Sequence, residues 1–423
     1  MIRLPSAANP EVSIVVLLDG SAEMGERCLR AIADGEDSVS TETILLLNDP
    51  DPSLESLARS TSGAKLVMSR ANAGPGVGWN LGATVAKAPR VASLHEDSEP
   101  SPGWLAPLVE TMTETGAGAV GSRLFNHDGT IQNCGWVLFS DGSHAQINTM
   151  SAPETAASTE PTPADFLSGA AMLVNLEAAD TFGRWDERFQ PAVYGDIDIT
   201  TAMWSRGRLV LSVPNSEVRH MSGSFDTRPN SPLTGPRLRL YLYERHCQRF
   251  LDKWGTALGN RAAPPPNLEP ESVRLATEAA LVHTDARAKL VREGGWKPAE
   301  QEPRAEHTFT GIAEPVIKEG DDAYTVAPQL VDALIEAEHE TVAGYCSWLI
   351  EREADLAKRL HEAGGHMEAL RTHATHLENE YGIAIARLDA IQSRMVWRLG
   401  SFVLRALRRA RQALSRGASR ASS

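Results

Sequence analysis

The sequence has few cysteines, no long apolar run and no excess of basic residues, and each absence excludes a class of protein. Its 423 residues contain four widely separated cysteines, so we expect neither a disulfide framework nor a zinc-binding pair: Cys28, Cys134, Cys247 and Cys346. No stretch reaches the roughly 20 apolar residues of a membrane span, and the N-terminus lacks a basic region followed by an apolar core. A net charge of -14 and a pI near 5.4 argue against nucleic acid as the main partner. These features predict a cytoplasmic protein.

Apolar runs and helical stretches alternate over the first 70 residues. A helical pattern at Glu23–Ala33 separates two of the runs, and Asp19 and Asn48 follow the first and second run. We expect these polar side chains to suit a base and a ribose. The alternation predicts an α/β fold of βαβ units with a mostly parallel central sheet. The runs have the length and composition of strands buried on both faces: Val12–Leu18, Thr43–Leu47 and Ala64–Met68.

Four glycines lie close together in the segment Asn72–Gly82, after the third predicted strand. Glycine lets backbone approach a ligand closely, and a helix N-terminus favours negative charge, so a loop that opens a helix here could bind phosphate. The spacing matches neither the dinucleotide fingerprint nor the P-loop. A tight turn that packs a helix on a strand explains the glycines equally well.

The segment Leu94–Glu99 begins in an apolar run and ends in three acidic residues before a Pro-Gly turn. If the run is a parallel strand, Asp97 lies at its carboxyl end, where open α/β folds bind their ligands. This makes Asp97 the candidate anchor for a metal-bound diphosphate. The alternative is a helix start, because Ser98 and Glu99 precede a plausible helix at Pro102–Thr115 and acidic residues suit a first turn.

Further strands are expected between residues 118 and 174, on either side of a loop. Ser151–Pro163 is rich in Ser, Thr, Ala and Pro and predicts a mobile surface loop. The small residues Ser168 and Gly169 would let a substrate lie against backbone. The predicted strands are Gly118–Leu124, Ile131–Phe139 and Asp165–Val174.

A second acidic cluster follows the segment Trp185–Phe189. Asp196 and Asp198 begin a helical pattern that continues through Ile199–Arg206, and a helix dipole favours ionised carboxylates at that end. Capping of the helix alone is the alternative explanation.

His220 ends the last predicted strand of this region. Neutral imidazole is a common metal ligand, and this histidine follows both acidic clusters, so it is a candidate ligand. We expect two short strands and then an amphipathic helix that ends at Gly255: Leu209–Val213, Glu217–His220 and Arg237–Trp254.

The order of these features resembles glycosyltransferase family 2 with the GT-A fold, especially the bacterial branch that includes rhamnosyltransferases for surface polysaccharides. The resemblance covers about Glu11–Gly255 and depends on the glycine-rich loop, the acidic segment followed by Pro-Gly-Trp, Ser168-Gly169, Phe-Gly-x-x-Asp-Glu-x-Phe, Asp-x-Asp and His220. It implies an inverting transfer of a sugar from a nucleotide-sugar donor to a hydroxyl of a growing cell-surface glycan or lipid-linked glycan.

The resemblance also implies roles for individual residues. Asp97, with His220 and His95, matches the site of a divalent metal, Mn²⁺ or Mg²⁺, and Asp196 matches the proposed general base. Donor contacts are implied for Asp19, Asn48, Asn72, Gly74, Gly78 and Asn80. An acceptor-side loop is implied for Trp185, Asp186, Glu187 and Asp198.

Three positions depart from the family pattern. Leu17-Leu18-Asp19 stands where relatives commonly have Thr-Tyr-Asn, His95 where Asp or Asn is usual, and Gly195 where Glu is usual. The alternative function is therefore a catalytically degenerate domain that acts as a glycan-binding or assembly scaffold.

The C-terminal third carries a heptad pattern. From Leu356 to Met395, apolar or small residues recur in steps of four and three, interrupted at Gly364-Gly365. Self-association through these helices is expected, with packing on the chain's own domain as the alternative. Arginines opposite an apolar stripe predict an interfacial helix on an anionic membrane at the inner face of the plasma membrane. The expected divisions are 1–260 for the GT-A domain, 261–328 for a linker and irregular or helical region, 329–395 for the coiled coil and 396–423 for the basic tail.

Overall fold

The computed structural model divides the chain into two compact units. The first comprises Met1–Pro229 and Thr234–Tyr345, and the second comprises Asn230–Leu233 and Cys346–Ser423. The structure describes residues 1–35, 38–147, 159–221, 235–296, 316–319, 322–362, 375–376 and 379–383.

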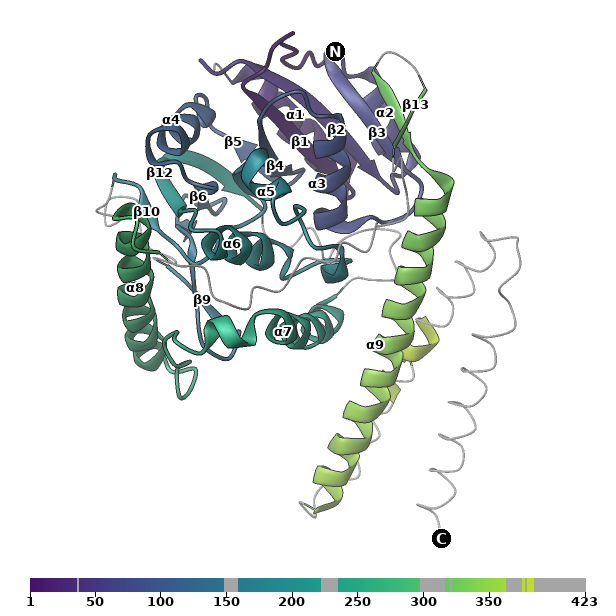
Figure 1. Cartoon of the computed structure of the whole chain (residues 1–423). Helices are drawn as coiled ribbons and strands as arrows, with labels where there is room; N and C mark the ends of the chain where they lie inside the picture. The colour runs from purple at the N-terminus through teal and green to yellow at the C-terminus, as the bar shows by residue number, and fades with distance from the viewer. Residues whose placement is uncertain are drawn as a thin grey trace. The chain divides into compact units, whose positions relative to one another are not determined.

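A mixed α/β fold forms the first unit, and its core is one large sheet (Figure 1). Twelve strands of the described residues belong to this sheet: β1 (Val12–Leu18), β2 (Thr41–Asn48), β3 (Ala64–Ser69), β4 (Arg90–His95), β5 (Ser98–Pro100), β6 (Ala119–Phe125), β7 (Ile131–Asn133), β10 (Thr162–Pro163), β11 (Ala171–Asn175), β12 (Val210–His220), β13 (Val316–Lys318) and β14 (Ala323–Val326). Their order is β10-β12-β6-β11-β4-β1-β2-β3-β14-β13, with β5 on β12 and β7 on β6. From β4 through β1, β2 and β3 to β14, each strand is parallel to the next, and β6 is parallel to β12, whereas β11 is antiparallel to both β4 and β6, and β13 is antiparallel to β14. The predicted α/β class with a mostly parallel central sheet is confirmed.

Helices cover the sheet. Ser21 and Asp51 cap the first two by accepting hydrogen bonds from backbone N–H groups of the first turn, which satisfies donors that a helix leaves unpaired. The helices of the described residues are α1 (Ala22–Asp34), α2 (Pro52–Ser60), α3 (Gly74–Val85), α4 (Leu105–Thr115), α5 (Leu176–Asp180), α6 (Gly195–Ser205), α7 (Pro236–Leu258), α8 (Pro270–Arg292) and α9 (Pro328–Glu362), with the 3-10 helix η2 (Glu187–Phe189).

Two glycines let α3 lie close to the sheet. A Cβ atom on Gly78 would lie 2.5 Å from Leu46 Cδ2, and one on Gly82 would lie 2.4 Å from Val15 Cγ1. Every residue of β1 and β2 is buried. This agrees with the continuous apolar runs, which predict strands that are covered on both faces. The predicted glycine-rich loop is therefore short: it ends at Ala73, and the later glycines lie within the helix.

Several predicted boundaries were wrong. Ile131–Phe139 is two strands, because Gly135 has a φ of 95° and turns the chain; the second of them, β8 (Trp136–Leu138), pairs with β9 (His144–Gln146) in a separate sheet. Of the predicted strand Asp165–Val174, only the end from Ala171 is strand. The two strands predicted around Pro214 are one, β12, with an irregularity between Val213 and Glu217.

Residues Ser98 and Glu99 belong to β5 and pair with β12, so the alternative reading of a helix start there is wrong. The helix begins later, at Leu105. In the predicted loop Ser151–Pro163, residues 151–158 lie outside the described residues, whereas Thr162 and Pro163 form β10. The helix expected to stop at Gly255 continues to Leu258.

A buried ion cluster fastens α8 to the rest of the first unit. Asp165 is 1% exposed, and its carboxylate contacts Arg287 and Thr284 of α8 and lies 2.7 Å from Arg261 Nη1. The Asp165 side chain also accepts a hydrogen bond from Leu138 N. The segment 261–328, expected to be a linker and irregular or helical region, thus contains a 23-residue helix joined to the core.

The second unit contributes the described end of α9 and the short stretches 375–376 and 379–383. Within it, the Arg352 guanidinium lies 4.6 Å from the centre of the Trp348 ring. Most of the predicted heptad region and all of the tail 396–423 lie outside the described residues. No helix in the described ranges is long and apolar enough to span a membrane.

Candidate functional site

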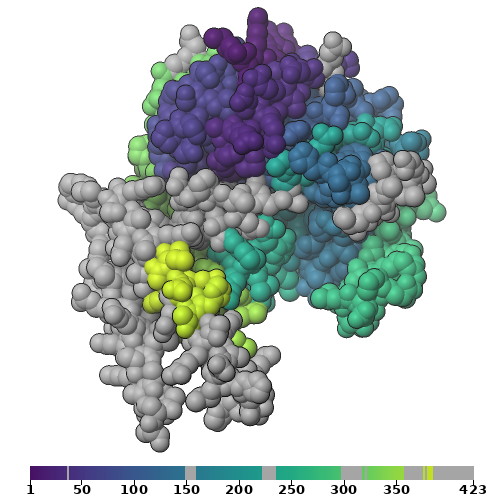
Figure 2. Space-filling view, turned by 180° about the vertical axis from the view of Figure 1, so that it is seen from behind, coloured from purple at the N-terminus to yellow at the C-terminus, as the bar shows by residue number. Residues whose placement is uncertain are grey.

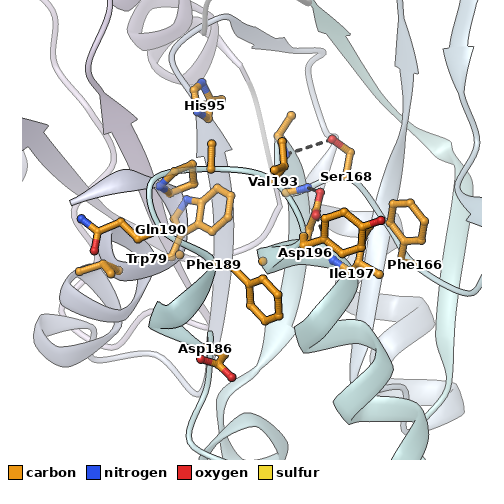
Figure 3. A pocket seen from close by; sticks show the side chains of 18 of the residues that line it. Trp79, His95, Phe166, Ser168, Asp186, Phe189, Gln190, Val193, Asp196 and Ile197 are labelled. Atoms are coloured by element: carbon orange, nitrogen blue, oxygen red, sulfur yellow. Dashed lines mark hydrogen bonds between the residues drawn. The ribbon is translucent and has the colours of Figure 1, made fainter. Parts of the chain in front are cut away.

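A cleft of about 270 Å³ lies at the carboxyl ends of β4 and β12. Its walls come from the start of α3, the residues after β4, the turn before β11 and the segment from η2 to α6. Figure 3 shows Trp79 and His95 on one side of this cleft and Asp196 and Phe166 on the other. The two predicted acidic clusters therefore meet in one cavity, although about 100 residues separate them in the sequence.

The three polar residues expected to contact the nucleotide lie together at the strand ends. Asn48 Nδ2 is 3.3 Å from Asp19 Oδ2 and 3.1 Å from Asn72 Oδ1. The side chains of Asn48 and Asn72 also accept hydrogen bonds from Ala73 N and Gly74 N. Asn48 is only 2% exposed, so much of its hydrogen-bonding capacity shapes the turn before α3.

The remaining donor candidates lie elsewhere. Gly74 has a φ of 64°, and a Cβ atom there would lie 2.4 Å from Pro191 O, so this position holds the chain against the 190–194 segment. Gly78 faces the sheet, as the packing alternative predicted. Asn80 donates to Trp185 O at 2.8 Å and to Glu187 Oε1 at 3.2 Å, so it fastens the loop 185–187 to α3.

The predicted metal residues converge on one oxygen. Asp97 Oδ1 lies 3.4 Å from His95 Nδ1 and 3.4 Å from His220 Nε2. This oxygen is buried and has no hydrogen-bond partner within the described part of the chain. The other ring nitrogen of His220, Nδ1, lies 2.7 Å from Gln132 Oε1, so Gln132 orients the imidazole. No motif in the sequence marks Gln132.

The charges in this group are strongly coupled. Burial raises the pKa of Asp97, but the two histidines outweigh it and hold this pKa well below its usual range. Burial lowers the pKa of His95, while the Asp97 carboxylate raises it to about 9. His95 therefore supplies positive charge beside Asp97.

The donor set fits a divalent ion whose coordination is completed by a ligand. Across the described ranges, no group of three or more His, Cys, Asp or Glu side chains is arranged to hold a metal on its own. Asp97 and His220 offer a carboxylate and an imidazole, which suit Mn²⁺, and Mg²⁺ commonly takes one or two carboxylates plus substrate phosphates.

Glu96 is a member of the acidic segment that the sequence did not single out. Its side chain turns away from Asp97 and accepts a hydrogen bond from Asp19 N at 2.9 Å. A Cβ atom on Gly20 would lie 1.9 Å from Glu96 Oε1, so the glycine makes room for this carboxyl group. Burial and the charge of Asp19 raise the pKa of Glu96 to about 8.

Asp196 lies in the first turn of α6, as predicted. Val193 and Tyr194 have φ values of 61° and 66°, and this left-handed pair turns the chain into the helix. The Asp196 carboxylate accepts hydrogen bonds from Ile197 N at 2.9 Å and Gly169 N at 3.4 Å. Burial nevertheless raises its pKa, which favours a carboxylate that can accept a proton.

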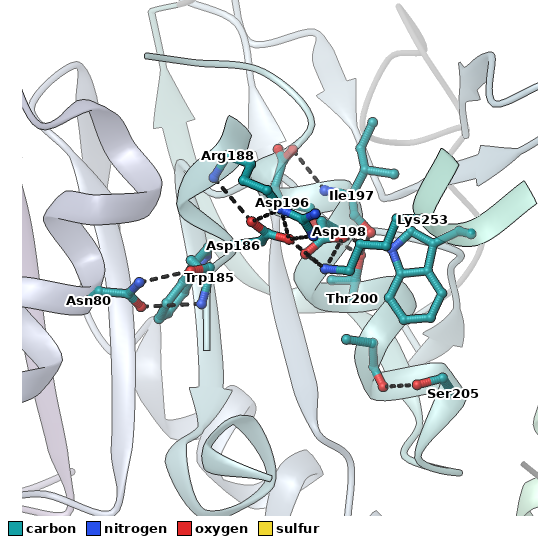
Figure 4. Close-up of polar contacts among 12 residues, drawn as sticks. Asn80, Trp185, Asp186, Arg188, Asp196, Ile197, Asp198, Thr200, Ser205 and Lys253 are labelled. Atoms are coloured by element: carbon teal, nitrogen blue, oxygen red, sulfur yellow. Dashed lines mark hydrogen bonds and ion pairs between the residues drawn. The ribbon is translucent and has the colours of Figure 1, made fainter. Parts of the chain in front are cut away.

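A buried lysine joins two carboxylates, Asp186 and Asp198, that the resemblance implies for the acceptor side (Figure 4). Lys253 Nζ of α7 lies 2.8 Å from Asp186 Oδ2 and 2.8 Å from Asp198 Oδ1. Asp198 also accepts from Trp254 Nε1 at 2.7 Å, and Asp186 pairs with Arg188. Through Lys253, Asp198 thus holds the loop in place. Asp186 and Glu187 of this loop also line the cleft. Helical periodicity put Lys253 on α7 but gave no hint of its partners.

Four rings form what we call the aromatic wall of the cleft: Trp136, His144, Phe166 and Tyr243. Trp136 and Phe166 stack with ring centroids 5.2 Å apart and planes inclined by 16°. His144 lies edge-on to both, and its ring centroid is 5.9 Å from that of Tyr243. No local pattern in the sequence marks the wall, because its members come from β8, β9, the turn before β11 and α7.

Comparisons with known proteins agree with the resemblance found in the sequence. Residues 13–182 match the family model described as Glycosyl transferase family 2, a range that contains Asp97 but ends before Asp196 and His220. A search of curated proteins found no match.

Two solved structures are similar to this chain. One is the crystal structure of GalNAc-T7 with UDP, GalNAc and Mn²⁺, at 15% identity over 68% of this chain and 57% of that chain, with a TM-score of 0.44. The other is the mannosyltransferase PcManGT from Pyrobaculum calidifontis in complex with GDP-Man and Mn²⁺, at 16% identity over 70% of this chain and 79% of that chain, with a TM-score of 0.41. The chain thus spans little more than half of the first of these.

Proposed function

We propose that this chain, whose residues 13–182 match glycosyl transferase family 2, is a GT-A glycosyltransferase. It would transfer a sugar from a nucleotide-sugar donor to a hydroxyl group of a glycan, with inversion at the anomeric carbon. The observation that carries the proposal is the single cleft in which Asp97, flanked by two histidines, and the buried carboxylate of Asp196 both lie.

The donor diphosphate would bind at the Asp97 side of the cleft. Asp97 and His220 would hold a Mn²⁺ or Mg²⁺ ion, which supplies positive charge to the leaving diphosphate oxygens. Three polar side chains that lie together at the strand ends would contact the nucleoside: Asp19, Asn48 and Asn72.

Asp196 would act as the general base. The acceptor oxygen forms a bond to the anomeric carbon, and the bond from that carbon to the diphosphate oxygen breaks with its electron pair going to the diphosphate. The acceptor proton passes to the Asp196 carboxylate, a role worth roughly 10²- to 10⁴-fold in rate. Gly169 N and Ile197 N hold this carboxylate in place.

A catalytically inactive scaffold that binds a glycan is the second candidate. It is favoured by the Gly195 and His95 departures and by the lack, among the described residues, of a three-residue metal group. In an inactive scaffold, nucleotide binding need not depend on a metal ion, whereas in the proposed enzyme it must.

Thermal-shift measurements with UDP-, GDP- and dTDP-sugars, each with and without Mn²⁺ or Mg²⁺, test the proposal. We expect stabilisation by at least one nucleotide sugar that depends on the ion and is lost in Asp97→Ala. Asp34→Ala, which changes an exposed carboxylate at the end of α1, is the matched control. If no nucleotide sugar gives a metal-dependent shift, the scaffold is the better description.

A further inference from the structure

The aromatic wall occupies part of the cleft that the donor and metal residues leave free. The rings of Trp136 on β8 and His144 on β9 contact each other edge-on, and Tyr243 reaches the cleft from α7. Phe166, which is 3% exposed, stacks against one side of the Trp136 ring and is fixed by the hydrogen bond from Trp136 N to its carbonyl. Trp136 itself is partly exposed, so the wall offers a rigid aromatic surface to the cavity.

The wall lies next to the proposed base. Figure 3 shows Phe166 and Asp196 on the same side of the cleft. Burial and the charge of Asp196 raise the pKa of Tyr243, whereas the charge of Arg239 lowers it. Asp196 and all four rings line the same cleft, so a molecule that lies on the wall is in the same cavity as the proposed base.

The wall is apolar and uncharged. Burial lowers the pKa of His144 to about 4, so the ring is a neutral imidazole at neutral pH. Phosphate binding usually depends on Arg, Lys or backbone N–H groups aimed at the ligand. The four side chains of the wall supply none of these, and Arg239 is the arginine that lines the same cleft. An aromatic surface in a cleft that also holds a carboxylate suits a ring that has a C–H face and a rim of hydroxyl groups.

We propose that the aromatic wall is the acceptor subsite and that it binds the saturated ring of a neutral sugar, stacked on Trp136 and Tyr243, with one hydroxyl directed to Asp196. This rests on the proposed function and narrows the acceptor to the sugar ring itself, rather than a phosphate or a peptide hydroxyl. Stacking on aromatic side chains of this kind contributes enough to change affinity about 2- to 10-fold.

Saturation-transfer NMR tests the subsite without requiring turnover. The probes are the methyl pyranosides of glucose, galactose, mannose and rhamnose, with glycerol 1-phosphate as the anionic comparison. We expect transfer to the ring C–H protons of at least one pyranoside with the wild-type protein, and an affinity about 10-fold weaker with Trp136→Ala. Trp136→Phe keeps a ring at this position and should retain most of the binding.

Two controls separate the subsite from the fold and from the proposed function. Trp348→Ala removes a tryptophan outside the cleft and should leave pyranoside binding unchanged. The metal-dependent nucleotide shift, measured in every variant, should persist in Trp136→Ala and so report a folded donor site.

The inference is overturned if Trp136→Ala binds pyranosides as well as the wild type, or if glycerol 1-phosphate binds and no pyranoside does. Pyranoside binding that depends on Trp136 without any metal-dependent nucleotide binding would uphold the subsite and reject the transferase. Metal-dependent nucleotide binding without any pyranoside binding would reject the subsite and uphold the transferase.

Discussion

Replacing Lys253 with methionine should destabilise the first unit strongly. The lysine side chain is 5% exposed and neutralises two carboxylates, Asp186 and Asp198, whose side chains are 5% and 1% exposed. Methionine keeps most of the stem volume but removes the charge. Asp198 would then retain Trp254 Nε1 as its hydrogen-bond donor and lose its only close cation among the described residues.

The size of the effect follows from the cost of an unpaired buried charge. Removing one partner of a buried ion pair typically costs about 3–5 kcal/mol. For a unit of this size, that loss corresponds to a fall in Tm on the order of 10 °C. Lys289→Met is the matched control, because Lys289 is 73% exposed and lies 3.8 Å from an exposed glutamate, so its replacement should leave Tm nearly unchanged.

The pH dependence of the loss identifies its cause. Burial lowers the pKa of Lys253, but Asp198 and Asp186 outweigh it and raise this pKa, so the lysine stabilises the native protein at every pH below its ordinary pKa of 10.5. In Lys253→Met, Asp186 would keep Arg188 as its partner, but Asp198, whose pKa burial already raises, would have a native pKa further above its unfolded one. The native state then binds the extra proton as the pH falls, and the loss should be smaller at pH 5 than at pH 8.

Thermal unfolding of wild type, Lys253→Met and the double variant Lys253→Met/Asp198→Asn at pH 5 and pH 8 measures this. The double variant should recover part of the stability, because it removes one of the uncompensated charges. A loss below about 1 kcal/mol, the size expected of an exposed pair, or an equal loss at both pH values would refute the reasoning.

Four further predictions concern separate parts of the chain. Asp196→Asn should abolish transfer and leave donor binding nearly intact, and near-normal turnover in the variant would reject the assignment. Because burial raises the pKa of Asp196, the kcat of the wild type should fall with decreasing pH at values above an ordinary aspartate pKa. Asp97→Ala should weaken metal-dependent nucleotide binding in calorimetry, and an unchanged metal requirement would move the site elsewhere. Gly82→Ala should lower the free energy of unfolding by about 1–3 kcal/mol in denaturant, because its Cβ would overlap the sheet. Gly255→Ala has open space in α7 and should raise it by about 0.5–1 kcal/mol, and effects of the same sign would contradict this. The tail after Met395 should bind anionic vesicles in a salt-sensitive way, with about 1 kcal/mol for each arginine near the surface, and equal sedimentation of full-length and truncated protein would exclude it as an anchor.

The sequence predicted the elements that are marked by residues close to one another in the chain. The runs that became β1 and β2 are continuous and apolar because both faces of these strands are covered, and Asp97 could be placed because the end of a parallel strand is a fixed position in such folds. The start of α6 at Asp196 was likewise marked by acidic residues in the first turn.

What the sequence could not predict depends on contacts between distant segments. Lys253 looks like any charged residue of an amphipathic helix until α7 brings it to Asp186 and Asp198. Trp136 lay inside a run that looked like one strand, and the turn at Gly135, which sends the chain into a second sheet, requires only one residue with positive φ. The aromatic wall appears only when four separate elements are assembled.

The hairpin of β13 and β14 gives the first unit an unusual order of assembly. β14 adds to β3 in parallel, so the strand that closes this edge of the sheet is made long after β1, β2 and β3. Until it arrives, β3 presents a row of unpaired backbone groups, the kind of edge that recruits strands from other chains. Pairings between such distant segments also form slowly. During synthesis on the ribosome, the part of the sheet formed by β1, β2 and β3 therefore stays open to aggregation until the chain has passed residue 326.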